Sequence, residues 1–93
     1  MSKQVTDIEY MDTLCTAASN GNMEIVTLLL DSGHINTSTF LYRAAFQCAS
    51  SKGHTRIVKL FCKHGTKQQF IYTNAMLAAS FTGHNDIVEL LMD

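Results

Sequence analysis

The chain has 93 residues, of which 46% are hydrophobic, and its formal net charge is -1 at pH 7. This length allows one small domain at most, and the near-zero charge excludes a molecule that attracts nucleic acid or an anionic membrane as a whole. No apolar stretch reaches the about 20 residues that span a bilayer, and the N-terminus has no apolar run typical of a secretory signal. We therefore expect a cytoplasmic, or nuclear, protein whose partner is neither a membrane nor a nucleic acid.

The first predicted element is a helix that begins near Thr6. Thr6 and Glu9 have the spacing of a capping box, in which a hydroxyl and a carboxylate accept hydrogen bonds from backbone N–H groups at a helix N-terminus. Apolar residues then follow at helical spacing, at Ile8, Met11, Leu14 and Ala18. This series predicts that one face of the helix is buried.

A pattern of glycine followed by an Ile-Val pair then recurs along the chain. The copies are GNMEIVTLLL from Gly21, GHTRIVKLFC from Gly53 and GHNDIVELLM from Gly83. In each copy a helix rich in small residues precedes the glycine, which ends it in a left-handed conformation, and a second helix with an apolar stripe follows. Self-similarity with a period of about 30 residues predicts a solenoid, in which each unit buries its apolar face against its neighbours. We therefore expect a binding surface and not an active site.

The segments between the repeats are polar and predict loops. They read GHINTSTF and GTKQQF, and their glycines, Gly33 and Gly65, are expected to close the second helices of the first two repeats. The residues around Leu41-Tyr42 and Ile71-Tyr72 are apolar and could extend the following helix backward.

These features resemble ankyrin repeats, whose unit of about 33 residues has a TPLHxAA start, an NGH turn and a second helix of the type xxIVxLLLxxG. The resemblance covers residues 12–93 and is strongest at AASNGNMEIVTLLLDSG and SKGHTRIVKLFCKHG. It implies an all-α, ankyrin-type helix-turn-helix solenoid of three repeats, the last incomplete, in a single domain over residues 1–93. The repeats would cover about 12–43, 44–73 and 74–93, with 1–11 as an N-terminal extension or cap.

The TPLH start is replaced by DTLC, AAFQ and NAML. The repeats are also shorter than the family's unit in the segments where ankyrin proteins build β-hairpin fingers, so we do not expect well-formed fingers.

In ankyrin proteins the residues before the turn glycine and before the TPLH start face a concave groove. The resemblance therefore implies a non-catalytic protein–protein interaction module, which binds another protein through the concave face of its short first helices. Phe81 stands out, because a large exposed aromatic residue among polar ones is typical of an interface anchor; local packing in a terminal repeat is the alternative. The implied contact residues are Met11, Ser19, Asn20, Arg43, Ser51, Lys52, Thr73, Phe81 and Thr82.

Other roles stay open. The chain could be a small regulatory or inhibitory subunit, or a fragment or protomer of a larger ankyrin assembly with a structural role. The last helix, HNDIVELLMD, has apolar residues over a wider arc than one neighbouring repeat covers. Exposed apolar patches mark association sites, so self-association through this C-terminal helix, by a two-fold contact, is a further expectation.

The four histidines and three cysteines do not predict a metal or catalytic site. His54 and His84 occupy equivalent turn positions in successive repeats, whereas zinc needs four converging ligands, so we expect structural histidines. The cysteines, Cys15, Cys48 and Cys62, fall within helices, and no pattern indicates a base that would activate a thiolate. We expect reduced, buried thiols, no enzymatic activity, no metal and no cofactor.

A basic stripe marks the second helix of the middle repeat. Arg56, Lys59 and Lys63 lie on one face, while the flanking repeats have acids in the same register, at Glu24, Asp31, Asp86, Glu89 and Asp93. One interpretation is a set of inter-repeat ion pairs that fix the stacking order, each contributing about 0–1 kcal/mol. The other is a site for phosphate or an acidic partner. The alternation of sign favours the ion pairs.

Overall fold

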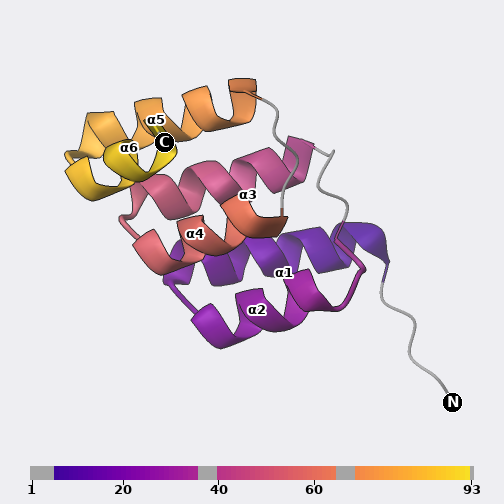
Figure 1. Ribbon diagram of the computed structural model, residues 1–93. Coiled ribbons are helices and arrows are strands. Elements are labelled where there is room, and N and C mark those ends of the chain that lie inside the picture. Colours follow the sequence, from indigo (N-terminus) through magenta and orange to yellow (C-terminus); the bar gives the residue numbers. More distant parts are fainter. Residues whose placement is uncertain (1–5, 36–39, 65–68, 93) are drawn as a thin grey trace, which may run out of the picture.

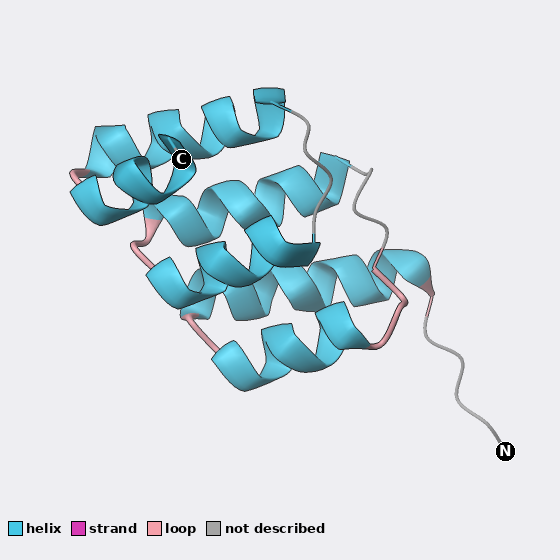
Figure 2. Cartoon of the chain, in the orientation of Figure 1, coloured by secondary structure: helices cyan, strands magenta, loops and turns pink. Residues whose placement is uncertain are grey.

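The computed structural model describes residues 6–35, 40–64 and 69–92, and within these ranges all regular structure is helical (Figure 2). The helices pair in chain order: α1 (Asp7–Asn20) with α2 (Met23–Asp31), α3 (Phe40–Ser51) with α4 (Thr55–His64), and α5 (Gln69–Thr82) with α6 (Asn85–Met92). The pairs stack so that α1, α3 and α5 form an inner layer and α2, α4 and α6 an outer one (Figure 1). The predicted all-α, helix-turn-helix solenoid is confirmed.

Helix α1 begins at the predicted capping box. The Thr6 hydroxyl accepts the backbone N–H of Glu9 at 3.3 Å, and the Glu9 carboxylate accepts the backbone N–H of Thr6 at 3.0 Å. The hydrogen bonds from the Thr6 backbone and side chain hold the pKa of Glu9 below its usual range. The two capping-box hydrogen bonds give acceptors to backbone N–H groups that have no partner within the helix at its start.

The first helix of each pair is the longer one, so the expectation of short first helices is wrong. Helices α1, α3 and α5 have 14, 12 and 14 residues, against 9, 10 and 8 for α2, α4 and α6. The predicted backward extension of α3 and α5 is confirmed, since α3 begins at Phe40 and α5 at Gln69. Tyr42 is fully buried there, and Tyr72 packs against the same core. The segments 36–39 and 65–68, which include Gly65, lie outside the described residues, so the reduction of the fingers stays a prediction.

The same glycine turn joins the two helices of every pair. Gly21, Gly53 and Gly83 have φ angles of 78°, 79° and 82°, in the left-handed region that favours glycine. The N–H of the following residue bonds back into the helix, from Asn22 to Ala17 at 2.9 Å, from His54 to Ala49 at 3.0 Å and from His84 to Ala79 at 2.8 Å. The predicted termination of the inner helices by glycine is thus confirmed.

An imidazole ring of one repeat covers the turn glycine of the repeat before it. A Cβ atom on Gly21 would lie 2.7 Å from the ring of His54, and one on Gly53 would lie 2.5 Å from the ring of His84. His54 Nε2 also lies 3.1 Å from the carbonyl oxygen of Ser19, to which it donates in the matching tautomer. The two histidines are therefore structural, as predicted, because they set the spacing between adjacent repeats.

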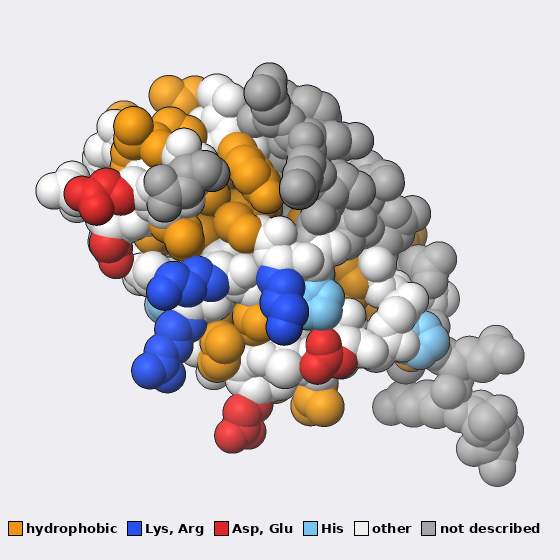
Figure 3. Space-filling model, viewed as in Figure 1, with side chains coloured by type: hydrophobic (Ala, Val, Ile, Leu, Met, Phe, Trp, Pro, Cys, Tyr) orange, Lys and Arg blue, Asp and Glu red, His pale blue; other side chains and the backbone are white. Residues whose placement is uncertain are grey.

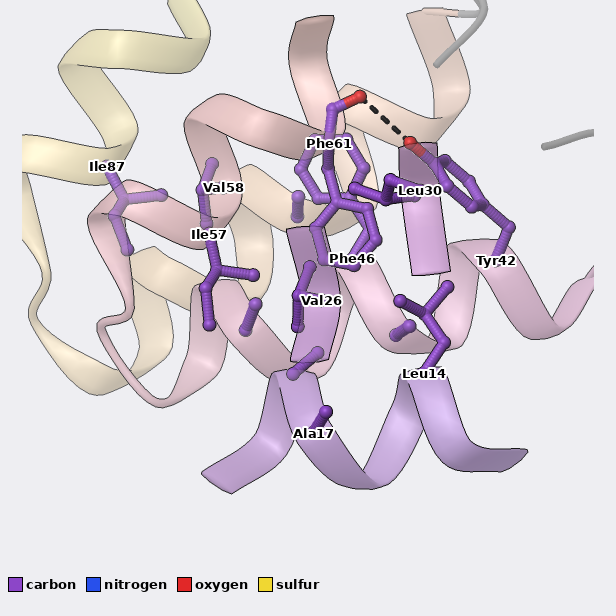
Figure 4. Close-up of a cluster of buried hydrophobic side chains, with 14 of the residues drawn as sticks. Leu14, Ala17, Val26, Leu30, Tyr42, Phe46, Ile57, Val58, Phe61 and Ile87 are labelled. Carbon is purple, nitrogen blue, oxygen red and sulfur yellow. Dashed lines mark hydrogen bonds between the residues drawn. The ribbon is translucent and has the colours of Figure 1, made fainter. Parts of the chain in front are cut away.

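Aromatic residues from both layers meet in the core of the middle repeat (Figure 4). The rings of Tyr42 and Phe61 are 5.1 Å apart edge to face, and those of Phe46 and Phe61 are stacked at 5.4 Å. The Tyr42 hydroxyl donates to the carbonyl oxygen of Phe61 at 2.9 Å. Since the last four carbonyls of a helix have no partner within it, this bond caps α4 from α3. Burial raises the pKa of Tyr42, so the hydroxyl keeps its proton.

We predict that Gly53→Ala destabilises the fold more than Gly83→Ala does. Each substitution forces a residue with a Cβ into the left-handed region, at about 1–2 kcal/mol. Only at Gly53 does the added Cβ also meet a histidine ring, since nothing lies within 4 Å of the equivalent position on Gly83. Urea denaturation of both variants measures the difference in the free energy of unfolding. Equal losses would show that the ring does not constrain the turn.

We predict that Tyr42→Phe lowers the free energy of unfolding by about 1–3 kcal/mol, because a buried carbonyl loses its donor while the ring packing stays. Tyr10→Phe is the matched control, at a half-buried ring that stacks on His34 with centroids 4.5 Å apart. Thermal unfolding followed by circular dichroism compares the two. A Tyr42→Phe variant as stable as the control would contradict the capping role of the hydroxyl.

Candidate protein-binding surface

A shallow groove runs between the inner helices α3 and α5. One part has a volume of about 210 Å³ and is lined by Phe40, Arg43, Ala44, Gln47 and Asn74. The next part has a volume of about 280 Å³ and is lined by Ala44, Gln47, Cys48, Ser51 and Ala78. The two parts share Ala44 and Gln47, so they form one continuous groove along the helices.

Large apolar side chains stand exposed along this groove. The exposed fractions are 68% for Phe40, 63% for Leu77 and 93% for Phe81. Leu77 and Phe81 lie one turn apart on α5, and their spacing from Asn74 and Ala78 puts them on the groove side of that helix. Phe40 begins α3 whereas Phe81 lies near the end of α5, so the two rings mark opposite ends of the groove.

The outer face shows a band of basic side chains between acidic ones (Figure 3). Arg56, Lys59 and Lys63 of α4 are exposed, and none forms an ion pair with an acid among the described residues. The predicted inter-repeat ion pairs are therefore wrong within the described part of the chain, because these side chains point to solvent and not across the repeat boundary. Asp93 lies outside the described residues.

Weaker polar contacts take the place of those ion pairs. His64 Nε2 lies 3.4 Å from Asp31 Oδ1, which joins α4 to α2. Thr55 Oγ1 donates to Asp86 Oδ2 at 2.6 Å, which joins α4 to α6, and this hydrogen bond holds the pKa of Asp86 below its usual range. No described acid of the chain pairs with the basic stripe, which is exposed to solvent.

Comparison with known protein families matches residues 14–93 to ankyrin repeats, in three copies. The chain belongs to the ankyrin repeat family. No curated protein and no solved structure matches it significantly. Ankyrin repeats generally mediate protein–protein interaction and are typically non-catalytic. The repeat bounds given above and the cytoplasmic or nuclear location stay predictions.

Most of the contact residues implied by the ankyrin resemblance lie at the surface. Arg43 and Ser51 are half-buried and line the groove. Ser19 is also half-buried, and its carbonyl oxygen lies against His54. The exposed ones are Asn20, Lys52, Thr73, Phe81 and Thr82.

Met11 does not belong to this ankyrin surface. Its side chain is 3% exposed and is part of the hydrophobic core. The expectation that it faces the groove is wrong, because Met11 belongs to the same helical series as Leu14 and Ala18, both fully buried. That series turns it toward the interior of the first repeat, where α1 packs on α2 and α3.

Phe40, Gln47 and Leu77 contribute to the ankyrin groove without having been predicted from the sequence. Gln47 and Leu77 occupy the same place relative to the turn glycines Gly53 and Gly83, and both are exposed. The polar residue Gln47 in the middle repeat could have indicated that the equivalent position in the last repeat, Leu77, also faces solvent. Phe40 had no such signal, because the start of α3 could not be located from the sequence.

A metal site and a reactive thiol each have requirements that can be compared with the described residues. Across 6–35, 40–64 and 69–92, no three His, Cys, Asp or Glu side chains are placed to hold a metal ion. Burial raises the pKa of the Cys15 and Cys62 thiols, which disfavours the nucleophilic thiolate. No helix in these ranges is long and apolar enough to cross a membrane.

Proposed function

We propose that this ankyrin chain is a non-catalytic module that binds another protein in the groove between α3 and α5. The observation that carries the proposal is the exposure of Phe81, at 93%, beside Leu77, at 63%. Neighbouring exposed apolar side chains mark interaction sites, and aromatic anchors supply most of the energy of such interfaces. Asn20, Lys52 and Thr82, at equivalent places before the turn glycines, supply a polar rim.

The dimensions of the groove favour a helical segment of the partner. From the level of Phe40 to the level of Phe81 the helices rise about 16 Å, which corresponds to about three turns of an α-helix. A peptide that binds by strand addition would need an open strand edge for backbone pairing, and the described ranges contain no strand. An amphipathic helix instead needs only side-chain contacts, with apolar residues one turn apart set against Leu77 and Phe81. A regulatory or inhibitory subunit would use this same surface.

A structural role in a larger ankyrin assembly is the second candidate, and the last helix pair favours it. Nothing lies within 4 Å of a Cβ position on Gly83, whereas Gly21 and Gly53 each meet a histidine ring. Met92, at the end of α6, is 70% exposed. A further repeat with a histidine at its turn would place that ring over Gly83 and cover Met92.

We predict that Phe81→Ala and Leu77→Ala each weaken partner binding by about 1 kcal/mol or more, the usual threshold for an energetically important interface residue. Leu28→Ala is the matched control, because Leu28 is 70% exposed but lies on α2, in the outer layer. The partner is recovered from the source cell with the wild-type chain, identified by mass spectrometry and titrated against each variant. Unchanged affinity for both inner-face variants, or an equal loss with Leu28→Ala, would exclude the groove as the site.

We predict that amides of α6 exchange with solvent faster than those of α4. Val58 of α4 is fully buried, whereas the equivalent Val88 of α6 is only half-buried, since α6 packs on one neighbouring outer helix and α4 packs on two. Helices with fewer buried contacts open at a lower free energy. Hydrogen exchange read by NMR measures this. Equal protection over residues 85–92 and 55–62 would show that the last pair needs no further cover.

A further inference from the structure

The outer helices α4 and α6 have opposite charges at equivalent positions. Arg56 and Lys59 of α4 are exposed, and so are Asp86 and Glu89 of α6. Each pair is separated by three positions, so each spans about 4.5 Å along its helix. The result is two rows of equal length and opposite sign on one face of the molecule.

A hydrogen bond across the repeat boundary places these two rows at the same height. Thr55 Oγ1 donates to Asp86 Oδ2 at 2.6 Å, so the first turn of α6 lies beside the first turn of α4. Both helices follow equivalent glycine turns and run in the same direction (Figure 1). Arg56 and Lys59 nevertheless form no ion pair with any described acid of their own chain. The charges are in register and all four residues are exposed to solvent.

Two-fold symmetry joins such rows without changing their register. A half-turn about an axis parallel to the helices, lying on the outer face between α4 and α6, brings a second copy face to face with the first. This rotation preserves height along the helices and sets α4 of each copy over α6 of the other. Arg56 then lies opposite Asp86, and Lys59 opposite Glu89, twice in one closed interface. An axis across the helices would instead set α4 over α4, with like charges together.

We propose that the outer face of α4 and α6 is a dimerisation surface whose occupant is a second copy of this chain. Helix α6 is favoured over α2 as the complement, because α6 has acids at the places equivalent to both Arg56 and Lys59, whereas α2 has Thr27 at the second of them. Met92, 70% exposed, adds apolar surface on α6. This face is separate from the α3–α5 groove, so a result that refutes the dimer leaves the proposed partner site untouched, and the reverse also holds.

Charge reversal on the full chain tests the dimer. Arg56→Glu with Lys59→Glu should raise the dimer dissociation constant by about tenfold or more, because like charges then face each other. Asp86→Lys with Glu89→Lys should do the same. Combining all four substitutions should return the dissociation constant to within about threefold of wild type, because every pair is restored with its signs exchanged. Sedimentation equilibrium over a range of protein concentrations measures each value.

The controls separate this contact from general charge effects and from misfolding. Lys52→Glu with Asp12→Lys reverses exposed charges away from the outer face, in the turn after α3 and on α1, and should leave the dimer unchanged. Circular dichroism should show equal helicity in the variants of Arg56, Lys59 and Glu89, since these residues are exposed. Asp86→Lys also removes the acceptor of the Thr55 hydrogen bond, so Glu89→Lys alone is the variant that reverses a charge on α6 and leaves this contact in place. Raising the ionic strength from about 0.1 M to about 1 M shortens the Debye length from about 10 Å to about 3 Å and should weaken the wild-type dimer.

The opposite results would overturn the proposal. A wild-type chain that stays monomeric at millimolar concentration has no such interface, and double variants that dimerise like wild type would place the interface elsewhere. A fourfold variant that stays monomeric would also refute the charge pairing. Titration of the wild-type chain with poly-glutamate then distinguishes the remaining use of the stripe, since saturable binding that is lost with Arg56→Glu and Lys59→Glu would indicate an acidic partner instead of a second copy.

Discussion

The stack of helix pairs depends on the contact between an imidazole ring and the turn glycine of the preceding repeat. The glycine is needed for two reasons at once: its φ is left-handed, and a Cβ would occupy the space of the ring. At the first boundary the ring also lies within hydrogen-bond distance of a carbonyl at the end of an inner helix, which otherwise has no helical partner. One side chain therefore determines the distance between two repeats and also gives the carbonyl at the turn a hydrogen-bond partner.

Close packing within the inner layer follows from that spacing, and the groove follows from the close packing. The buried positions of α3 and α5 that face neighbouring helices include Ala45, Ala49, Ala75 and Ala79, all fully buried. Small side chains at these positions let the helices approach. On α5 the fully buried side chains that the structure describes are alanines, and the longer side chains of Leu77 and Phe81 lie exposed.

The sequence predicted the architecture because the signals that carry it are local. The turn glycines, the capping box at Thr6 and the apolar stripes each act over a few residues, and all were found in place. The binding surface was harder to predict. The family register that placed Phe81 correctly at the surface also placed Met11 there, although the helical period of its own helix assigns it to the core. For Met11 the family register and the helical period gave opposite predictions. The helical period was correct, because it reflects which face of the helix is buried.

The charges were beyond the reach of sequence reasoning for a different reason. Alternation of sign between repeats is compatible with pairing inside the chain or outside it, and the choice depends on side-chain direction. Only the three-dimensional arrangement shows that Thr55, and not a lysine or arginine, contacts the acid on α6. A hydroxyl in that place holds the helices together without neutralising the basic stripe beside it.

The order of the packing contacts has a consequence for how the chain unfolds. Helix α1 packs on α3 and α3 on α5, while α4 lies between α2 and α6. In such a linear array stability is the sum of each unit and its interfaces, so the ends can open while the rest stays folded. The middle pair takes part in both interfaces. A substitution that destabilises the middle pair weakens both interfaces, so the whole array unfolds. A substitution that destabilises α6 allows only the last pair to unfold. The unfolding transition therefore depends on which repeat is weakened.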